Sequence, residues 1–400
     1  MNYLNFVTSN KYLLLFGFLC VFVGNLGQTF FISLFNKDLI SQLLLDKDRL
    51  SLIYSAATLV SGFTMFFVGS KIDDIEVKKF TSMVLLGLLV SCVVFATSNS
   101  LWMLFFAYLG IRLCGQGLMG HIAVTTLMRY IPEHRGKAVS LALQGMAVGE
   151  ITLPLIAVTL LSHYGHQTSW LVYAAIGLSV FFPLMLWLLY KADLKPIVRD
   201  DIAKQSTELT QDWTRQRVMA DWRFWLMIPA LIAPAFLITG IFFHQTLLIE
   251  SKGWSLQWLS LGIMAYGVLH FAGAIFIGPM VDNSKPRKLL NWYLLPLMLG
   301  VACLYFGEQK FWLMAFMILA GMTVASSGPI VNSFYADIFG TTHLGAIRSL
   351  IAAIMIISTG LAPYLFSLFS SIDNFLLFAL SYGIYCLMAI QKKLLAEKIS

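Results

Sequence analysis

Two oppositely charged side chains, Arg112 and Glu150, interrupt long apolar stretches of this sequence. Arg112 lies in YLGIRLCGQGLMGH, and Glu150 lies in QGMAVGEITLP. A charge deep in a membrane costs about 2.5 kcal/mol or more even on lenient insertion scales, so such a residue must face a cavity or a partner. These two residues are therefore the first candidates for chemistry in the chain.

Their residue types suggest two roles and one structural alternative. Arg112 can act as the counter-ion of an anionic solute or as a member of a proton relay. Burial raises the pKa of a carboxyl group toward neutrality, and a nearby cation lowers it. Because both influences act on Glu150, its side chain can exchange a proton with solvent. This is the chemistry of proton coupling. The alternative is a buried Arg112–Glu150 pair that only keeps the fold intact.

Polar side chains in the middle of other apolar stretches complete the candidate substrate site. Residues four apart share a helical face, as Tyr54 with Thr58 and Tyr266 with His270 do. His270 can carry a proton or serve as a packing residue. A break at Ser326, Ser327, Gly328 and Pro329 would free backbone carbonyls for a ligand. The predicted substrate-binding residues are Asn25, Gln28, Tyr54, Thr58, Arg112, Tyr266, His270, Ser326 and Ser327, and the predicted proton-coupling residues are Glu150, Arg112 and His270.

A short charged pattern occurs twice, 209 positions apart, as GSKIDDIEVKK and GPMVDNSKPRK. In each copy an Asp follows a Gly by four residues and a basic cluster comes next. Gly permits close approach of two helices, and an Asp can interact with the positive end of a neighbouring helix. We predict a gate at these hairpins, the alternative being ordinary solvated loops. The predicted gating residues are Gly69, Asp73, Lys78, Lys79, Arg135, Gly278, Asp282, Arg287 and Lys288.

The elements that must position these residues are membrane-spanning helices. Hydrophobic residues make up 58% of the chain and charged residues 12%, against about 25% charged in soluble domains. A span needs about 20 mostly apolar residues. We predict an all-α membrane protein with twelve spans in two pseudo-symmetric six-helix bundles, near residues 12–35, 50–70, 80–97, 101–122, 137–161, 169–190, 224–247, 257–280, 289–306, 311–333, 345–369 and 374–391.

The basic residues are distributed unevenly over the predicted loops. With both termini inside, 21 of the 27 Lys and Arg residues lie on the inner side and five on the outer side. Basic loops stay in the cytoplasm, so the net charge of +7 reports topology and not nucleic-acid binding. We predict a multi-pass protein of the bacterial inner (plasma) membrane with both termini cytoplasmic.

The predicted domains are an N-terminal bundle (1–190), a cytoplasmic linker (191–223) and a C-terminal bundle (224–400). No Gly-rich phosphate-binding loop or catalytic constellation is found in the sequence, so neither an ATP-driven pump nor an enzyme is expected. His163 and His166 are predicted to belong to a surface turn, and neither a metal nor a cofactor is expected. The expected partners are a small-molecule solute and membrane lipid, with a monomer as the assembly.

Two similar halves, a long middle segment and the duplicated loop pattern resemble the major facilitator superfamily over essentially the whole chain. Arg112 resembles the Arg of this family's fourth-helix motif, although Gln116 and Gly117 follow it by four and five positions and not by three and four. Gly145, Gly149 and Pro154 resemble the family's fifth-helix stretch. The resemblance implies a secondary transporter in which two bundles rock about a site at the membrane midplane.

Within the superfamily, the segments TFFISLFNKDL, RYIPEHRGKAVSLALQGMAVG and FGTTHLGAIRS look most like the monocarboxylate and oxalate/formate antiporter branch. This branch usually has a basic residue in the eighth span, where the sequence offers His270. We therefore expect proton-coupled transport or exchange of an organic anion such as a carboxylate. The alternatives are a drug or siderophore exporter and a membrane ligand sensor that has lost transport.

Overall fold

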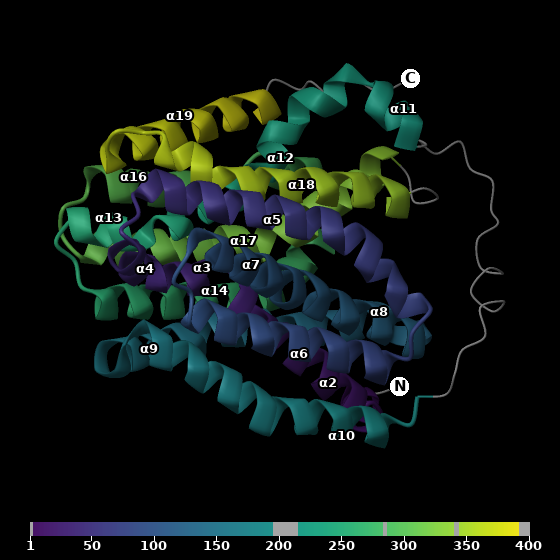
Figure 1. Ribbon diagram of the computed structural model, residues 1–400. Helices are drawn as coiled ribbons and strands as arrows, with labels where there is room; N and C mark the ends of the chain where they lie inside the picture. The colour runs from purple at the N-terminus through teal and green to yellow at the C-terminus, as the bar shows by residue number, and fades with distance from the viewer. Residues whose placement is uncertain (1–2, 195–214, 283–285, 340–343, 392–400) are drawn as a thin grey trace. The chain divides into compact units, whose positions relative to one another are not determined.

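The computed structural model (Figure 1) describes residues 3–194, 215–282, 286–339 and 344–391, and within these ranges it contains helices and no strand. The chain forms two compact units. Unit 1 comprises Met1–Lys195 together with Phe242–Leu247, and unit 2 comprises Pro196–Ile241 together with Leu248–Ser400. A six-residue segment from the second half of the sequence thus belongs to the first unit.

Unit 1 is built mainly from the first half of the chain. Its helices are α1 (Tyr3–Ser9), α2 (Lys11–Gly24), η1 (Asn25–Gly27), α3 (Thr29–Ile32), η2 (Ser33–Phe35), α4 (Asn36–Leu43), α5 (Lys47–Gly69), η3 (Ser70–Asp73), α6 (Val77–Ala96), α7 (Leu101–Gly110), η4 (Ile111–Met119), α8 (Gly120–Tyr130), η5 (Pro132–His134), α9 (Arg135–Ile176), η6 (Gly177–Phe181) and α10 (Phe182–Ala192).

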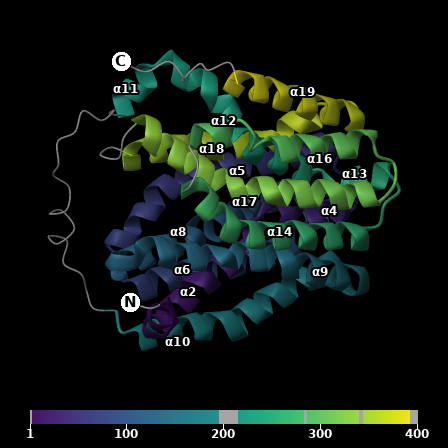
Figure 2. The same cartoon turned by 180° about the vertical axis from the view of Figure 1, so that it is seen from behind.

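Unit 2 contains α11 (Arg215–Ala220), α12 (Trp222–Phe243), α13 (Gln245–Ser251), α14 (Leu256–Asp282), α15 (Pro286–Leu290), α16 (Leu295–Phe306), α17 (Phe311–Phe339), α18 (Leu344–Ser367) and α19 (Ile372–Gln391), except for the residues of α12 and α13 that belong to unit 1. The helices α14 and α17 lie side by side in both ribbon views (Figure 2). Gly321 permits this contact, because a Cβ there would lie 2.5 Å from the Tyr266 carbonyl oxygen.

Local sequence explains where several helices begin and bend. Asp46 caps α5, since its carboxylate accepts a hydrogen bond from the Arg49 backbone N–H at 2.7 Å, and Ser100 caps α7 in the same way. Gly165 has a φ of +76° inside the stretch assigned to α9. This left-handed glycine separates the predicted spans 137–161 and 169–190.

Each of the twelve predicted spans falls on a helix or on consecutive helices. By length and composition, eight helices among the described residues can cross a membrane, or nine if the pair Lys11–Gly27 and Thr29–Leu43, bent by 47°, is one span. The chain is a multi-pass, all-α membrane protein.

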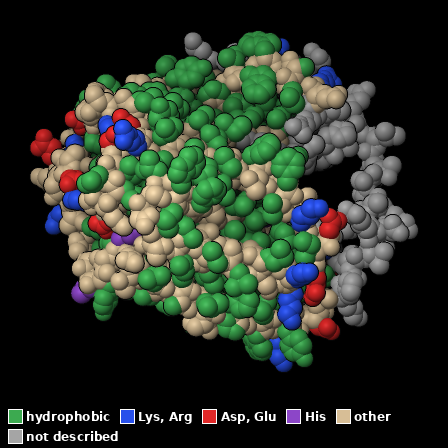
Figure 3. Space-filling view, viewed as in Figure 1, with side chains coloured by type: hydrophobic (Ala, Val, Ile, Leu, Met, Phe, Trp, Pro, Cys, Tyr) green, Lys and Arg blue, Asp and Glu red, His purple; other side chains and the backbone are tan. Residues whose placement is uncertain are grey.

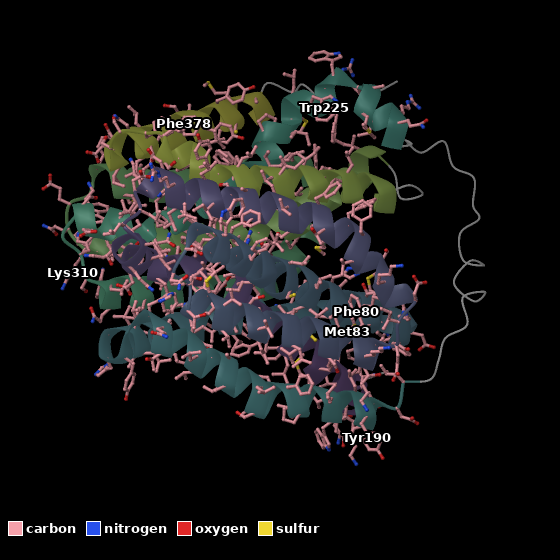
Figure 4. The ribbon with its side chains drawn as sticks, viewed as in Figure 1. Phe80, Met83, Tyr190, Trp225, Lys310 and Phe378 are labelled. Carbon is pink, nitrogen blue, oxygen red and sulfur yellow. The ribbon has the colours of Figure 1, made fainter. Side chains whose placement is uncertain are left out.

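The exposed faces of unit 1 suit a lipid environment. On α6, Phe80 is 3% exposed and Met83, three residues on, is 56% exposed (labelled in Figure 4). In Figure 3 hydrophobic side chains cover the middle of the α5 and α6 surface, and charged side chains gather toward the ends of the helices. The apolar side chains that cover these helices can face acyl chains.

Two local predictions are wrong. The tenth span does not break, because α17 continues from Phe311 through Pro329 to Phe339. The surface-turn interpretation also fails for His166, which is buried against the rings of Phe35 and Phe95 at centroid distances of 5.9 and 5.4 Å.

Candidate functional site

The candidate site of unit 1 begins where the first span is interrupted. The helix α2 gives way to the short 3-10 helix η1, and Gln28 then takes an extended conformation (φ −84°, ψ 146°) before α3 starts. A break in a helix leaves backbone carbonyls without their usual partners, which must be replaced inside the protein. The carbonyl of Gly27 becomes available in this way.

Gly27 also allows η1 to lie directly on η4. A Cβ at this position would lie 2.6 Å from the Ile111 carbonyl oxygen and would overlap the backbone nitrogen of Gln116. From the opposite side, a Cβ on Gly115 would lie 2.9 Å from the Gly27 Cα. Two facing glycines therefore bring the broken helix against the segment that carries Arg112.

Arg112 is the centre of this contact and is only 2% exposed. Its Nη1 donates hydrogen bonds to the Gly27 carbonyl oxygen at 2.9 Å and to the Thr29 hydroxyl at 3.3 Å. The guanidinium carbon lies 5.2 Å from the centre of the Tyr54 ring, within range of a cation–π interaction. None of these three partners is a carboxylate. The buried Nε makes no hydrogen bond within the described structure.

Tyr54 and Thr58, expected on one face of the second span, are both buried in α5. The hydroxyl groups of Tyr54 and Thr29 are 2.8 Å apart, so Tyr54 shares Thr29 with Arg112. Thr58 is buried one helical turn after Tyr54, on the same face of α5. The half-buried Gln28 lies at the break itself. The structure thus places Tyr54 against Arg112, and Gln28 directly after the Gly27 carbonyl that Arg112 contacts.

Glu150 is 1% exposed and lies on α9. The short helix η1 contacts both α9 and η4, so the elements that carry Glu150 and Arg112 meet at the same break. Asn25 fixes one of these contacts by donating a hydrogen bond from Nδ2 to the Gly145 carbonyl oxygen at 3.1 Å. A Cβ on Gly149 would overlap that amide nitrogen. The Gly145–Gly149 pair thus accommodates Asn25, whose side-chain amide serves packing.

In unit 2, Tyr266 and His270 lie on α14 with ring centroids 6.2 Å apart, as their spacing of four residues predicts. Ser326 and Ser327 lie on α17, and both hydroxyls donate to the Thr323 carbonyl oxygen of the same helix. Such bonds to the preceding turn satisfy the hydroxyls locally.

The first charged loop is held by residues of α8 that the sequence analysis did not select. His121 Nε2 lies 3.0 Å from the Gly69 carbonyl oxygen, and Arg129 donates to the Ile72 carbonyl oxygen at 3.3 Å. Lys78 and Lys79 are exposed at the start of α6. A signal for His121 was present, since it ends the Gly-rich GQGLMGH stretch.

The remaining predicted gating residues fall on α15, near the end of α14 or at positions whose side chains lie outside the described structure. Lys288 is exposed on α15. Gly278 and Asp282 lie near the end of α14. The side chains of Asp73, Arg135, Asp282 and Arg287, and the surroundings of Gly278, lie outside the described structure.

A protein-family comparison identifies the chain. The family profile described as Major Facilitator Superfamily matches residues 17–363 and 246–396. The chain belongs to the major facilitator superfamily. It is accordingly a membrane transporter and not an enzyme. No curated protein matches the sequence of this superfamily member.

Solved structures share the fold of this major facilitator protein at low sequence identity. A bacterial homolog of the human lysosomal transporter Spinster, in an inward-facing and occupied conformation, is 14% identical with a TM-score of 0.69, over 96% of this chain and 94% of the other. A variant of the nucleoside transporter NupG is 13% identical with a TM-score of 0.74, over 95% of this chain and 99% of the other. At such identities the likeness establishes the fold alone.

The local helix type accounts for a departure from the superfamily's fourth-helix motif. Arg112, Gln116 and Gly117 lie in η4, a π-helix. A π-helix bonds residues five apart where an α-helix bonds residues four apart, and such segments are frequent at functional sites. Gly117 comes five residues after Arg112 and therefore lies one π-helical turn beyond it. In an α-helix the residue four positions after the Arg would lie there. The extra position in the sequence is absorbed by the wider turn.

Proposed function

We propose that this major facilitator protein is a secondary transporter that moves a small organic anion by alternating access, coupled to protons or by exchange. The observation that carries the proposal is the environment of Arg112. Both of its hydrogen bonds come from Nη1, its buried Nε makes none among the described residues, and none of its three partners is a carboxylate. A buried cation is costly without compensating charge.

A carboxylate is the anion that suits this geometry best. A guanidinium presents several N–H donors in a planar fork, which a carboxylate can accept in pairs. The Gly27 carbonyl and the Thr29 hydroxyl already accept from Nη1, so the Nε side is the edge left for a ligand. Tyr54, Thr58 and Gln28 would contact the remainder of the solute. Tyr266, His270, Ser326 and Ser327 stay predicted substrate-binding residues of unit 2.

Counterflow in proteoliposomes tests this proposal. Purified protein would be loaded with unlabelled lactate, oxalate or formate in turn, and entry of the same labelled anion would be measured. We expect counterflow of at least one anion, lost in Arg112→Gln and retained in Arg49→Gln, which alters an exposed arginine. Counterflow with organic cations or siderophores, but with no anion, would favour the exporter. Thermal stabilisation by an anion without any flux would favour the ligand sensor.

We further propose that Glu150 exchanges the coupling proton. Burial at the helix contact beside η1 is the observation that supports this role. Glu150→Gln keeps the shape of the side chain but cannot titrate, so it should abolish uptake driven by a pH gradient and leave exchange at equal pH largely intact. Glu133→Gln, which alters an exposed carboxylate, serves as the matched control. If Glu150→Gln still drives uphill uptake, His270 is the next candidate.

The proposed orientation places both termini and the segment 191–223 in the cytoplasm of a bacterial cell. The bias of 21 inner to five outer basic residues supports it. A cysteine in place of Ser206 should react with an impermeant thiol reagent only after the cells are opened. A cysteine in place of Leu44, an exposed residue of the predicted outer side, should react in intact cells. Reversed labelling would overturn the topology.

A further inference from the structure

The start of α2 and the end of α10 meet at one end of unit 1, on the side that is predicted to face the cytoplasm (Figure 1 and Figure 2). Tyr12 is the second residue of α2, and Trp187 lies in the last two turns of α10. Their ring centroids are 5.8 Å apart in an edge-to-face arrangement, which aromatic pairs prefer. This contact brings the polar residues at the two helix ends together.

Two exposed lysines flank this aromatic pair. The Nζ atom of Lys11 lies 5.1 Å from the centre of the Tyr12 ring, within range of a cation–π interaction. Lys191 follows Trp187 by four residues and therefore lies on the same face of α10. Neither lysine forms an ion pair within the described structure. Since neither helix contains an acidic residue, the two lysines outweigh Asp193, which directly follows α10, and the charge at this end is positive.

Hydrogen-bond donors accompany the lysines. Tyr12 and Tyr190 carry hydroxyl groups, Trp187 carries an indole N–H, and none of these groups has a hydrogen-bond partner among the described residues. Trp187 and Tyr190 are exposed, and Tyr190 projects from the end of α10 in Figure 4. Ammonium, hydroxyl and indole groups can all donate to an oxyanion, and hydrogen bonds with an ionised partner are the stronger ones. This end of unit 1 is therefore suited to a phosphate group.

Exposed apolar side chains continue from these donors along both helices. Leu15 lies one turn after Lys11 on α2 and is exposed. Pro183 lies one turn before Trp187 on α10 and is exposed as well. Cations at the helix ends and apolar side chains one turn deeper match the two parts of a phospholipid, its charged headgroup and its acyl chains. A free phosphate would make no use of the apolar side chains.

We propose that the ends of α2 and α10 bind an anionic phospholipid, with its phosphate between Lys11 and Lys191 and an acyl chain along Leu15 and Pro183. The net charge of the headgroup decides between lipid classes. A zwitterionic headgroup supplies its own cation to the phosphate, whereas an anionic headgroup gains from each lysine near the membrane surface. A lipid bound here bridges the first and the sixth predicted spans, whichever solute the protein transports.

Native mass spectrometry of the full-length protein measures which lipid it retains. The protein would be incubated in detergent with phosphatidylglycerol, phosphatidylethanolamine or phosphatidylcholine, and we expect the tightest retention of phosphatidylglycerol. Lys11→Gln and Lys191→Gln should each weaken this retention about five-fold, the effect of one lysine at a membrane surface. Lys11→Arg should retain the lipid, because it keeps the charge. The controls are Lys78→Gln and Lys137→Gln, which remove exposed lysines on the same predicted side.

Two outcomes of this measurement would overturn the site. Equal losses in the control variants would show attraction to the general positive charge of this side of the protein. Equal retention of the three lipids would show that the lysines do not select an anionic headgroup.

Competition and thermal unfolding separate the lipid from a soluble phosphate ester. An excess of glycerol phosphate should leave phosphatidylglycerol bound, and full displacement would assign the site to a soluble ligand. Phosphatidylglycerol should raise the unfolding temperature of the wild-type protein, since a ligand of the folded state stabilises it by mass action. The rise should be lost in the double variant Lys11→Gln/Lys191→Gln, and an equal rise there would place the lipid elsewhere on the protein.

Discussion

Replacement of Gly27 by alanine should damage the Arg112 site more than any neighbouring Gly→Ala change. The added Cβ would lie 2.6 Å from the Ile111 carbonyl oxygen, about 0.8 Å short of the 3.4 Å at which ordinary contact begins. The obstructing atoms belong to the backbone, including the Gln116 nitrogen, and cannot rotate away. The helices η1 and η4 must therefore separate.

Separation on this scale would break the 2.9 Å hydrogen bond between Arg112 and the Gly27 carbonyl. Overpacking costs about 1–3 kcal/mol, and a hydrogen bond to a charged group contributes about 1.5–3 kcal/mol. Because one displacement causes both effects, we expect a total of about 2–4 kcal/mol and not the full sum. The Arg112 site should be disordered in the same variant.

Thermal unfolding of purified protein in detergent measures the effect, and counterflow of labelled anion measures its functional consequence. Gly120→Ala is the matched control, because a Cβ at Gly120 meets nothing within 4 Å. That control should be neutral or stabilising, since alanine is favoured over glycine inside a helix by about 0.5–1 kcal/mol. A Gly27→Ala protein that unfolds at or above the temperature of Gly120→Ala would refute the close backbone approach.

Gly149→Ala should lower the unfolding temperature, because its Cβ would overlap the Asn25 amide, whereas Gly136→Ala, which meets nothing within 4 Å, should not. Asn25→Ala in the Gly149→Ala background should recover part of the loss, since it removes the colliding group, and absence of any recovery would contradict the assigned contact. His121→Ala should lower the free energy of opening of the first charged loop by about 1 kcal/mol, because the bond to Gly69 is lost. Hydrogen exchange in residues 69–76 should then be about five-fold faster. Unchanged exchange there would mean that the loop is held by other groups.

The sequence was sufficient to predict the helical membrane fold. A stretch of about 20 apolar residues has few alternatives to a span, because lipid offers no partner for backbone groups. Burial of Arg112, Glu150, Tyr54 and Thr58 followed from the same principle, since charged or polar residues within such stretches avoid lipid.

The tertiary structure decided which groups these residues meet. Arg112 bonds to Gly27, 85 positions away, because the first span breaks there and frees a carbonyl. The break at Ser326–Pro329 was equally plausible from the sequence, yet α17 runs through it. Helix interruption depends on what the neighbouring helices can offer to the freed backbone groups, and sequence spacing does not contain that information. For the same reason no local pattern indicated that Phe242–Leu247 belongs to unit 1, since the donors that satisfy its carbonyls lie 207 and 209 positions away in the chain.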